Sequence, residues 1–92
     1  MKWQLEYSDK AMHQLRKFDA AQSAIILSWM KKSIDGCENP RLHGKGLSAD
    51  HTGVWRYRIG DYRVLCDIQD SRVVVLAFNI EHRSKVYRKK LK

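Results

Sequence analysis

Three arginines surround a short turn in the second half of the chain, at Arg56, Arg58 and Arg63. The Gly60-Asp61 pair between them suits a two-residue type II′ turn, because glycine at its first central position supplies the positive φ that this turn requires. A hairpin built on that turn places Arg58 opposite Arg63 and gathers the three arginines, here called the arginine face, on one side of a sheet. Like charges across a strand pair destabilise a sheet by roughly 0.2–1 kcal/mol, whereas guanidinium groups bind phosphate through a planar fork of donors. We therefore predict an anion-binding face, with a solvated sheet face as the alternative.

The opposite side of the same hairpin is wholly apolar or aromatic, and we expect it to pack on helices. Its members are Trp55, Tyr57, Ile59, Tyr62, Val64 and Cys66. A third strand, joined by a loop of two or four residues, is expected to bring Phe78 beside Arg63. Leu76 then lies beside Leu65. That register predicts an apolar floor for the arginine face, made of Val74, Leu76, Phe78 and Ile80. The C-terminal segment could cover this floor instead, and periodicity alone leaves both arrangements open.

An imidazole, a guanidinium and a phenol follow the third predicted strand, at His82, Arg83 and Tyr87. Such groups move protons and stack on bases in RNA chemistry. Taken singly, a histidine is more often a surface residue, and a terminal tyrosine more often packs in a core. Because they arrive at the edge of the arginine face, the functional and the structural interpretations both stay open.

Positioning these groups requires a sheet backed by helices, and the hydrophobic pattern predicts both. Trp3, Leu5 and Tyr7 alternate with polar residues as in a strand, and Ser8 and Asp19 are typical N-caps of the two helices that follow. The expected elements are a strand at 3–7, helices at 9–17 and 20–35, a long loop at 36–53 with room for a brief strand at its end, and strands at 54–59, 62–68 and 73–80. The order β-α-α-β-β-β predicts an α+β fold, with an antiparallel sheet packed against a helical hairpin. A chain of 92 residues is expected to be a small single domain over residues 1–92.

The net charge indicates the kind of partner. Lys and Arg number 18 against 10 Asp and Glu, which gives a net charge of +8, and most of the excess lies in the second half of the chain. A field of this sign concentrates polyanions, so nucleic acid or an acidic protein that mimics it is the expected partner. Solubility alone is the alternative explanation of the charge.

The sequence also bears on compartment and cofactors. No run approaches the roughly 18 apolar residues that a membrane span requires, and the first residues alternate in polarity unlike an apolar signal core. Cys37 and Cys66 form no CxxC motif and the histidines are scattered, so we expect two free thiols, no metal site and no cofactor. Free thiols suit a reducing compartment, and we expect a cytoplasmic protein with no membrane partner.

Two motifs stand at a defined spacing, GVWRYRIGDYRVL at 53–65 and HRSKVYR at 82–88. Together they resemble the RelE/ParE superfamily of bacterial toxins, and most closely its RelE branch. The expected strand and helical hairpin that precede them match the architecture of that superfamily. RelE-type toxins are small basic ribonucleases that enter the ribosomal A site, cut the mRNA there and stop translation. An acidic antitoxin encoded beside the toxin holds it inactive.

The resemblance implies the toxin of a type II toxin–antitoxin system, acting as a ribosome-dependent and metal-independent endoribonuclease, or mRNA interferase. Its partners would be a RelB-like acidic antitoxin, the ribosome and mRNA, with a DNA operator bound only through the antitoxin complex. RNA supplies its own nucleophile in such a reaction, the 2′-OH, and the products are a 2′,3′-cyclic phosphate and a 5′-OH. The protein then has to hold the phosphate, stabilise its charge and move two protons.

By the family's motif, the active site falls on the arginine face together with Arg83 and Tyr87. The arginine face would stabilise the charge on the phosphate, Arg83 would contact the scissile phosphate or the leaving oxygen, and Tyr87 would stack on or orient a base. His82 is the candidate for proton transfer, because histidine changes its charge near neutral pH. Further RNA contacts are expected at Lys45, Lys85, Arg88, Lys89 and Lys90.

Two features of the sequence depart from the family pattern. Arg56 and Arg58 stand where well-known RelE members carry lysines, one of them proposed as a general base, and arginine stays protonated and is a poor base. Glu81 stands where many relatives have glycine. If no good base exists, orientation by the ribosome must contribute much of the rate.

Two other functions compete with mRNA cleavage. A ParE-like toxin that inhibits DNA gyrase has the same fold, although the complete set of arginines and the tyrosine argue against it. A nucleic-acid-binding module without catalysis would need only the basic tail. An acidic neighbouring reading frame would favour both toxin functions over the third.

Overall fold

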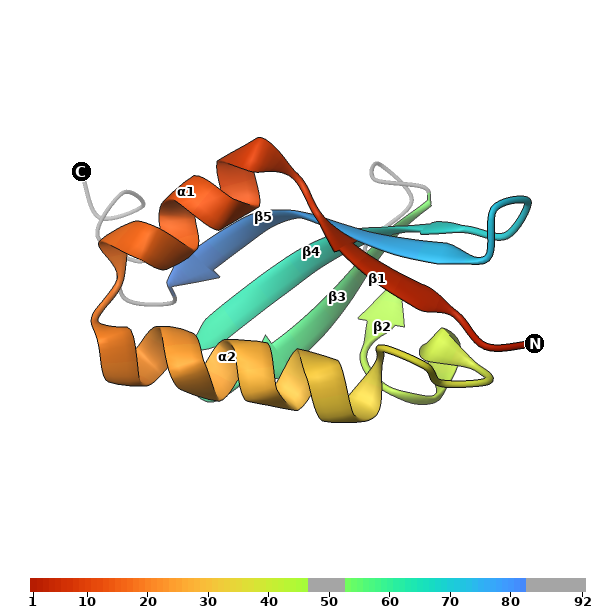
Figure 1. The fold of residues 1–92 in the computed structure, drawn as a ribbon, viewed down its shortest axis with the longest axis horizontal. Coiled ribbons are helices and arrows are strands. Elements are labelled where there is room, and N and C mark those ends of the chain that lie inside the picture. The colour runs from red at the N-terminus through yellow and green to blue at the C-terminus, as the bar shows by residue number, and fades with distance from the viewer. Residues whose placement is uncertain (47–52, 83–92) are drawn as a thin grey trace.

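The computed structural model describes residues 1–46 and 53–82, which form two α-helices packed on a five-stranded sheet (Figure 1). The elements are β1 (Gln4–Tyr7), α1 (Asp9–Lys17), α2 (Ala20–Ser33), the short 3₁₀ helix η1 (Pro40–Leu42), β2 (Lys45–Gly46), β3 (Val54–Ile59), β4 (Tyr62–Gln69) and β5 (Val74–His82). Neighbouring strands follow the order β1-β5-β4-β3-β2. The α+β fold expected from the sequence is confirmed. The brief strand of the long loop is β2, which lies inside the predicted loop 36–53 and not at its end.

The first strand joins the sheet on the far side of β5. It runs parallel to β5, with Gln4 paired to Val74 and Tyr7 paired to Ala77, whereas the other neighbouring strands are antiparallel. The sheet is therefore mixed, and not antiparallel throughout. The two helices separate β1 from the later strands, so no tight turn imposes an antiparallel pairing on it.

Both helices begin at the residues that the sequence predicts. Ser8 caps α1 by accepting a hydrogen bond from the Ala11 amide at 3.1 Å, and Asp19 caps α2 through a 3.2 Å bond from the Ala21 amide. The chain leaves α2 slightly before the predicted end, and Gly36 then turns it with a φ of 81°. In the described part of the chain, no helix is long and apolar enough to cross a membrane.

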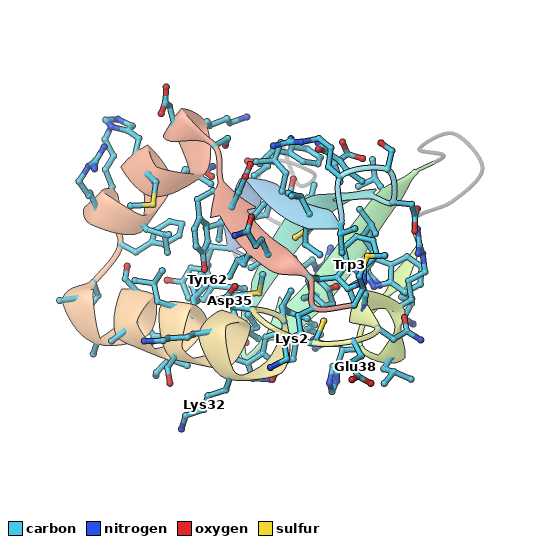
Figure 2. All side chains as sticks on the ribbon, turned by 45° about the vertical axis from the view of Figure 1, so that its right-hand side comes forward. Lys2, Trp3, Lys32, Asp35, Glu38 and Tyr62 are labelled. Atoms are coloured by element: carbon cyan, nitrogen blue, oxygen red, sulfur yellow. The ribbon has the colours of Figure 1, made fainter. Side chains whose placement is uncertain are left out.

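The core lies between the helices and one face of the sheet. The predicted apolar side of the β3–β4 hairpin supplies Tyr57, Val64 and Cys66, which are fully buried, and Tyr62, which is labelled in Figure 2. The helices and the turn after α2 contribute Ala11, Leu15, Ile26, Met30 and Ile34. The prediction that this side of the hairpin packs on helices is confirmed.

The register between β4 and β5 differs from the prediction. The connecting loop is residues 70–73, one step later than expected, and a β-bulge then shifts the pairing between Leu65 and Cys66. The later loop moves the pairing by two residues and the extra residue Phe78 moves it by one more, so Leu65 pairs with Asn79 and not with Leu76. One extra residue reverses which side chains of β5 face the core.

The predicted apolar floor of the arginine face is therefore wrong in two respects. Arg63 pairs with Glu81 and not with Phe78. Ile80 belongs to the core, where only 2% of it is exposed. The alternation that the sequence suggested holds for the first half of β5 and is inverted after the bulge.

Helix α1 covers the edge of β5 beyond the end of β1. Ser8 Oγ donates to the Phe78 carbonyl at 3.2 Å. Gln14 Oε1 accepts from the Ile80 amide at 2.8 Å, and Gln14 Nε2 donates to Asn79 Oδ1 at 2.9 Å. These bonds satisfy an edge that β1 does not reach, and they fix the position of the second half of β5.

Candidate nucleic-acid interface

The β3–β4 hairpin positions the arginine face. Gly60 has a φ of 59°, as the first central residue of a type II′ turn requires, and Arg58 pairs with Arg63 across the hairpin. Arg56 lies two residues before Arg58 on β3, so all three side chains leave the same side of the sheet, away from the buried residues that alternate with them. The predicted pairing of residues 55–59 with β4 is confirmed in full.

Strand β2 adds a fourth cation to this side of the sheet. Lys45 pairs with Arg56, and Gly46 pairs with Trp55. Side chains directly opposite each other in antiparallel strands share a face, with Cβ atoms about 4.5–5.5 Å apart. Lys45, a predicted RNA contact, therefore lies beside Arg56. Lys45 and the three residues of the arginine face are together called the cationic face.

Aromatic side chains hold the segment that carries β2. The Tyr57 hydroxyl donates to the Pro40 carbonyl at 2.6 Å, and Trp55 Nε1 donates to the His43 carbonyl at 2.7 Å. Trp29 of α2 packs against Tyr57 and His43, with ring centroids 5.6 and 5.5 Å apart. The core side of β3 thus fixes the segment that brings Lys45 to the opposite side.

Gly44 allows this segment to approach β3 closely. Its φ is 72°, in the left-handed region that favours glycine, and an added Cβ would collide with the carbonyl oxygen of Arg56. The same Cβ would come within 2.9 Å of Trp55 Nε1. The backbone next to Lys45 therefore packs directly on the backbone of the arginine strand.

Within the described residues, no other side chain forms an ion pair with Lys45 or with the arginine face. The ion pairs among these residues join Arg41 to Asp70 and Arg72 to Glu6. One arginine of the face is exposed and two are half-buried. Their guanidinium donors are therefore available to a phosphate group.

Three carboxylates of the described strands lie on the same side of the sheet, those of Glu6, Asp67 and Glu81, and of these Glu81 lies directly opposite an arginine of the face. Glu81 pairs with Arg63, which in turn pairs with Arg58, so the three form a row across β5, β4 and β3. Sequence reasoning did not place Glu81 here, because both sides of β5 carry apolar residues and no break in their alternation marks the bulge. The pairing of the strands alone reveals it.

His82 lies on the opposite side of the sheet from the arginine face. Its partner across the strands is the buried Tyr62, and the two rings meet edge to face with centroids 4.7 Å apart. Phe18 packs on Tyr62 with a centroid distance of 4.9 Å. The bulge therefore brings Glu81, and not His82, beside Arg63. The remaining predicted site residues lie outside the described residues: Arg83, Lys85, Tyr87, Arg88, Lys89 and Lys90.

Reactive groups in the core do not extend this site. Burial raises the pKa of Tyr7 to about 12 and also raises the pKa of the Cys66 thiol, so both stay protonated at neutral pH. Across residues 1–46 and 53–82, no group of three or more His, Cys, Asp or Glu side chains is arranged to hold a metal ion. Among the described residues, the groups that can take part in binding or chemistry therefore lie on the cationic face.

These features define a small α+β protein with a cationic sheet face. A family model described as the ParE toxin of type II toxin–antitoxin systems, parDE, matches residues 5–87. Because this match spans most of the chain, the protein belongs to that family, within the RelE/ParE superfamily, and is the toxin of a type II toxin–antitoxin system. The superfamily indicated by the two sequence motifs is confirmed.

Similar proteins agree with this assignment. Toxin RelG of Mycobacterium tuberculosis is 25% identical over 89 residues, which is 97% of this chain and 100% of the relative. The toxin–antitoxin complex RelBE2 of M. tuberculosis contains a chain with a TM-score of 0.80 at 23% identity, covering 91% of this chain and 94% of that chain. The isolated E. coli RelE toxin has a TM-score of 0.68 at 16% identity, covering 97% and 95%. The solved structures share the fold.

Proposed function

We propose that the protein is a ribosome-dependent endoribonuclease that cleaves mRNA in the ribosomal A site and so stops translation. The observation that carries this proposal is the gathering of cations from three adjacent strands on one sheet face. They are Lys45, Arg56, Arg58 and Arg63. Such a set suits the phosphates of an RNA strand, and its guanidinium groups suit the charge that gathers on one phosphate during cleavage.

The proposed reaction needs little covalent chemistry from the protein. The 2′-oxygen of the ribose attacks the adjacent phosphorus in line, the bond to the 5′-oxygen breaks, and a 2′,3′-cyclic phosphate and a 5′-OH remain. The arginine face would stabilise the extra negative charge at the phosphorus. Arg83 would contact the scissile phosphate or the leaving oxygen, and Tyr87 would stack on or orient a base.

We propose an acidic antitoxin as the partner that restrains this activity. Similar solved structures include toxin–antitoxin complexes from M. tuberculosis and E. coli. A net charge of +8 favours a partner of opposite charge. The toxin would reach a DNA operator only through the antitoxin complex.

Inhibition of DNA gyrase is the second candidate function, because the matching family model carries the ParE name. Brief induction in a bacterium distinguishes the two, if RNA 5′ ends, translation and DNA supercoiling are measured separately. We expect new 5′ ends clustered in frame within translated codons, with supercoiling intact. Loss of supercoiling with intact mRNA would establish gyrase inhibition instead, and RNA binding without cleavage would indicate a non-catalytic module.

Attack by the 2′-OH needs no metal ion, so we expect cleavage on preassembled ribosome complexes to survive EDTA when the Mg²⁺ that maintains the ribosome is controlled for. Replacing the 2′-OH at the scissile nucleotide with hydrogen should abolish cleavage. Products with a 5′-phosphate would contradict this mechanism.

A further inference from the structure

The cationic face contains a row in which a carboxylate stands next to two guanidinium groups. Glu81 on β5 pairs with Arg63 on β4, and Arg63 pairs with Arg58 on β3. Neighbouring strands lie about 4.8 Å apart, so Arg58 and Glu81 are about 10 Å apart along the row, with Arg63 between them. A phosphate held by the two arginines would lie within reach of the Glu81 carboxylate.

The fold fixes Glu81 in this place. The bulge at Phe78 inserts one residue into β5, and β-bulges re-aim the side chains that follow them. Gln14 of α1 binds the backbone of Ile80 at 2.8 Å and the side chain of Asn79 at 2.9 Å, immediately before Glu81. Glu81 is thus held by neighbours on both sides of it, since His82 packs on Tyr62.

The Glu81 carboxylate is also available as an acceptor. Although Glu81 lies directly opposite Arg63, the two form no ion pair, and no other described residue forms one with Glu81. Arginine cannot accept a proton at physiological pH, whereas an ionised carboxylate can. Asp67 lies on the same side, diagonal to Arg56, but its carboxylate accepts a hydrogen bond from Gln69 Nε2 at 3.0 Å. Among the described residues, Glu81 is the carboxylate that lies directly beside the Arg58–Arg63 pair and can act as a base there.

We propose that Glu81 is the proton acceptor of the cleavage reaction, an inference that rests on the proposed endoribonuclease function. Its carboxylate takes the proton from the 2′-OH while the 2′-oxygen forms its bond to phosphorus. The bond between phosphorus and the 5′-oxygen breaks, and the leaving oxygen takes a proton from water. The Glu81 carboxyl then returns its proton to water, so the overall reaction consumes no proton.

A different role for the same residue gives the opposite result. If Glu81 only offsets the positive charge of Arg63, it weakens RNA binding, and its removal strengthens binding and leaves the chemical step intact. The two roles therefore separate when binding and cleavage are measured independently.

The test uses the full-length protein on programmed ribosomes, with RNA dissociation constants and single-turnover cleavage rates at saturating protein. Glu81→Gln keeps the shape of the side chain and removes its charge. Glu38→Gln is the matched control, because Glu38 is an exposed residue of the loop between α2 and η1, outside the strands that carry the arginine face. We expect cleavage by Glu81→Gln to be at least about 100-fold slower, as for loss of a general base, with RNA binding unchanged or tighter. Glu38→Gln should cleave like the wild type.

Rescue distinguishes a missing base from a folding defect. We expect formate to restore cleavage by Glu81→Gly at least about tenfold, with no effect on the wild type, since a small carboxylate can occupy the space left by the side chain. If formate does not rescue Glu81→Gly and Glu81→Gln cleaves at a near-normal rate, the role of Glu81 is overturned, but the proposed function is not. A wild-type protein that does not cleave RNA overturns the proposed function itself.

Discussion

Arg58 and Arg63 face each other across the hairpin, and neither is held by a carboxylate within the described residues. Such a pair is unfavourable in the free protein and becomes favourable when an anion lies between the two groups. Replacing one arginine of this pair therefore shows whether it serves function or stability.

Replacing Arg58 with threonine tests this separation. Arg58→Thr removes the like-charge pair, places a β-branched residue on a strand and leaves the buried Tyr57 untouched, so the free energy of unfolding should hold or rise. Cleavage should fall by two orders of magnitude or more, since lost charge stabilisation costs about 3 kcal/mol and every ~1.4 kcal/mol is tenfold.

Stability is measured by thermal unfolding and activity by single-turnover cleavage, both on the same purified Arg58→Thr variant. Lys32→Gln is the control, because it removes one positive charge from an exposed position of α2 (Figure 2). A destabilised but active Arg58→Thr protein would remove the arginine face from the mechanism.

The Arg41–Asp70 pair predicts a local dependence on pH. Arg41 donates to both carboxylate oxygens of Asp70, at 3.0 and 2.8 Å, and these bonds hold the pKa of Asp70 below its ordinary value. The stabilisation is present above the pKa of Asp70 in the unfolded chain and is lost as the pH falls through the lower pKa of the folded state. In Arg41→Gln the pKa of Asp70 should rise, as measured by NMR titration of its carboxyl carbon. An unchanged titration would show that this ion pair does not form in solution.

At the scale of elements, the contact between β2 and β3 decides whether Lys45 joins the arginine face. That contact depends on Gly44, which lies against the carbonyl of Arg56 with a φ of 72°. The position of Lys45 beside the arginine face thus depends on a residue without a side chain at position 44.

Gly44→Ala should therefore be more destabilising than the same change at Gly36. Gly36 also has a positive φ, 81°, but an added Cβ there meets nothing within 4 Å. Both variants carry the strain of a left-handed residue, about 1–2 kcal/mol, and Gly44→Ala adds roughly 1–3 kcal/mol from the collision. Urea unfolding compares the two, and equal losses would contradict the close approach. RNA binding should weaken only in Gly44→Ala, because β2 carries Lys45.

At the scale of the whole molecule, the net charge of +8 governs association. A protein with an open cationic face binds RNA with little discrimination unless a partner covers that face. An acidic segment could pair with the arginine face or displace the chain that follows β5.

We therefore expect an acidic protein encoded beside this toxin to restore growth on co-expression and to co-purify with it at moderate salt. The association rate should fall as salt is added, because charge attraction steers the encounter and salt screens it. Pull-down and kinetic binding at several salt concentrations measure this. Toxicity that no acidic neighbour relieves, or no toxicity at all, would count against the prediction.

The sequence by itself determined the local parts of this structure. Ser8 and Asp19 start the helices where they stand, because a capping side chain binds backbone amides only two or three residues away. Gly60 and the alternation around it set the whole β3–β4 register, because a two-residue turn leaves one pairing that buries the apolar side. The arginine face followed from that register.

Only the tertiary structure decided the contacts between distant segments. The parallel pairing of β1 with β5, the docking of β2 that brings Lys45 to Arg56, and the bulge that exchanges Ile80 for Glu81 on the arginine face have no local signal. Strand pairing without a tight turn is set by the packing of helices and sheet around one core, and an extra residue in a strand that is apolar on both sides leaves no mark in the hydrophobic pattern. For that reason the cations of this toxin could be predicted from the sequence, whereas the position of Glu81 opposite Arg63 could not.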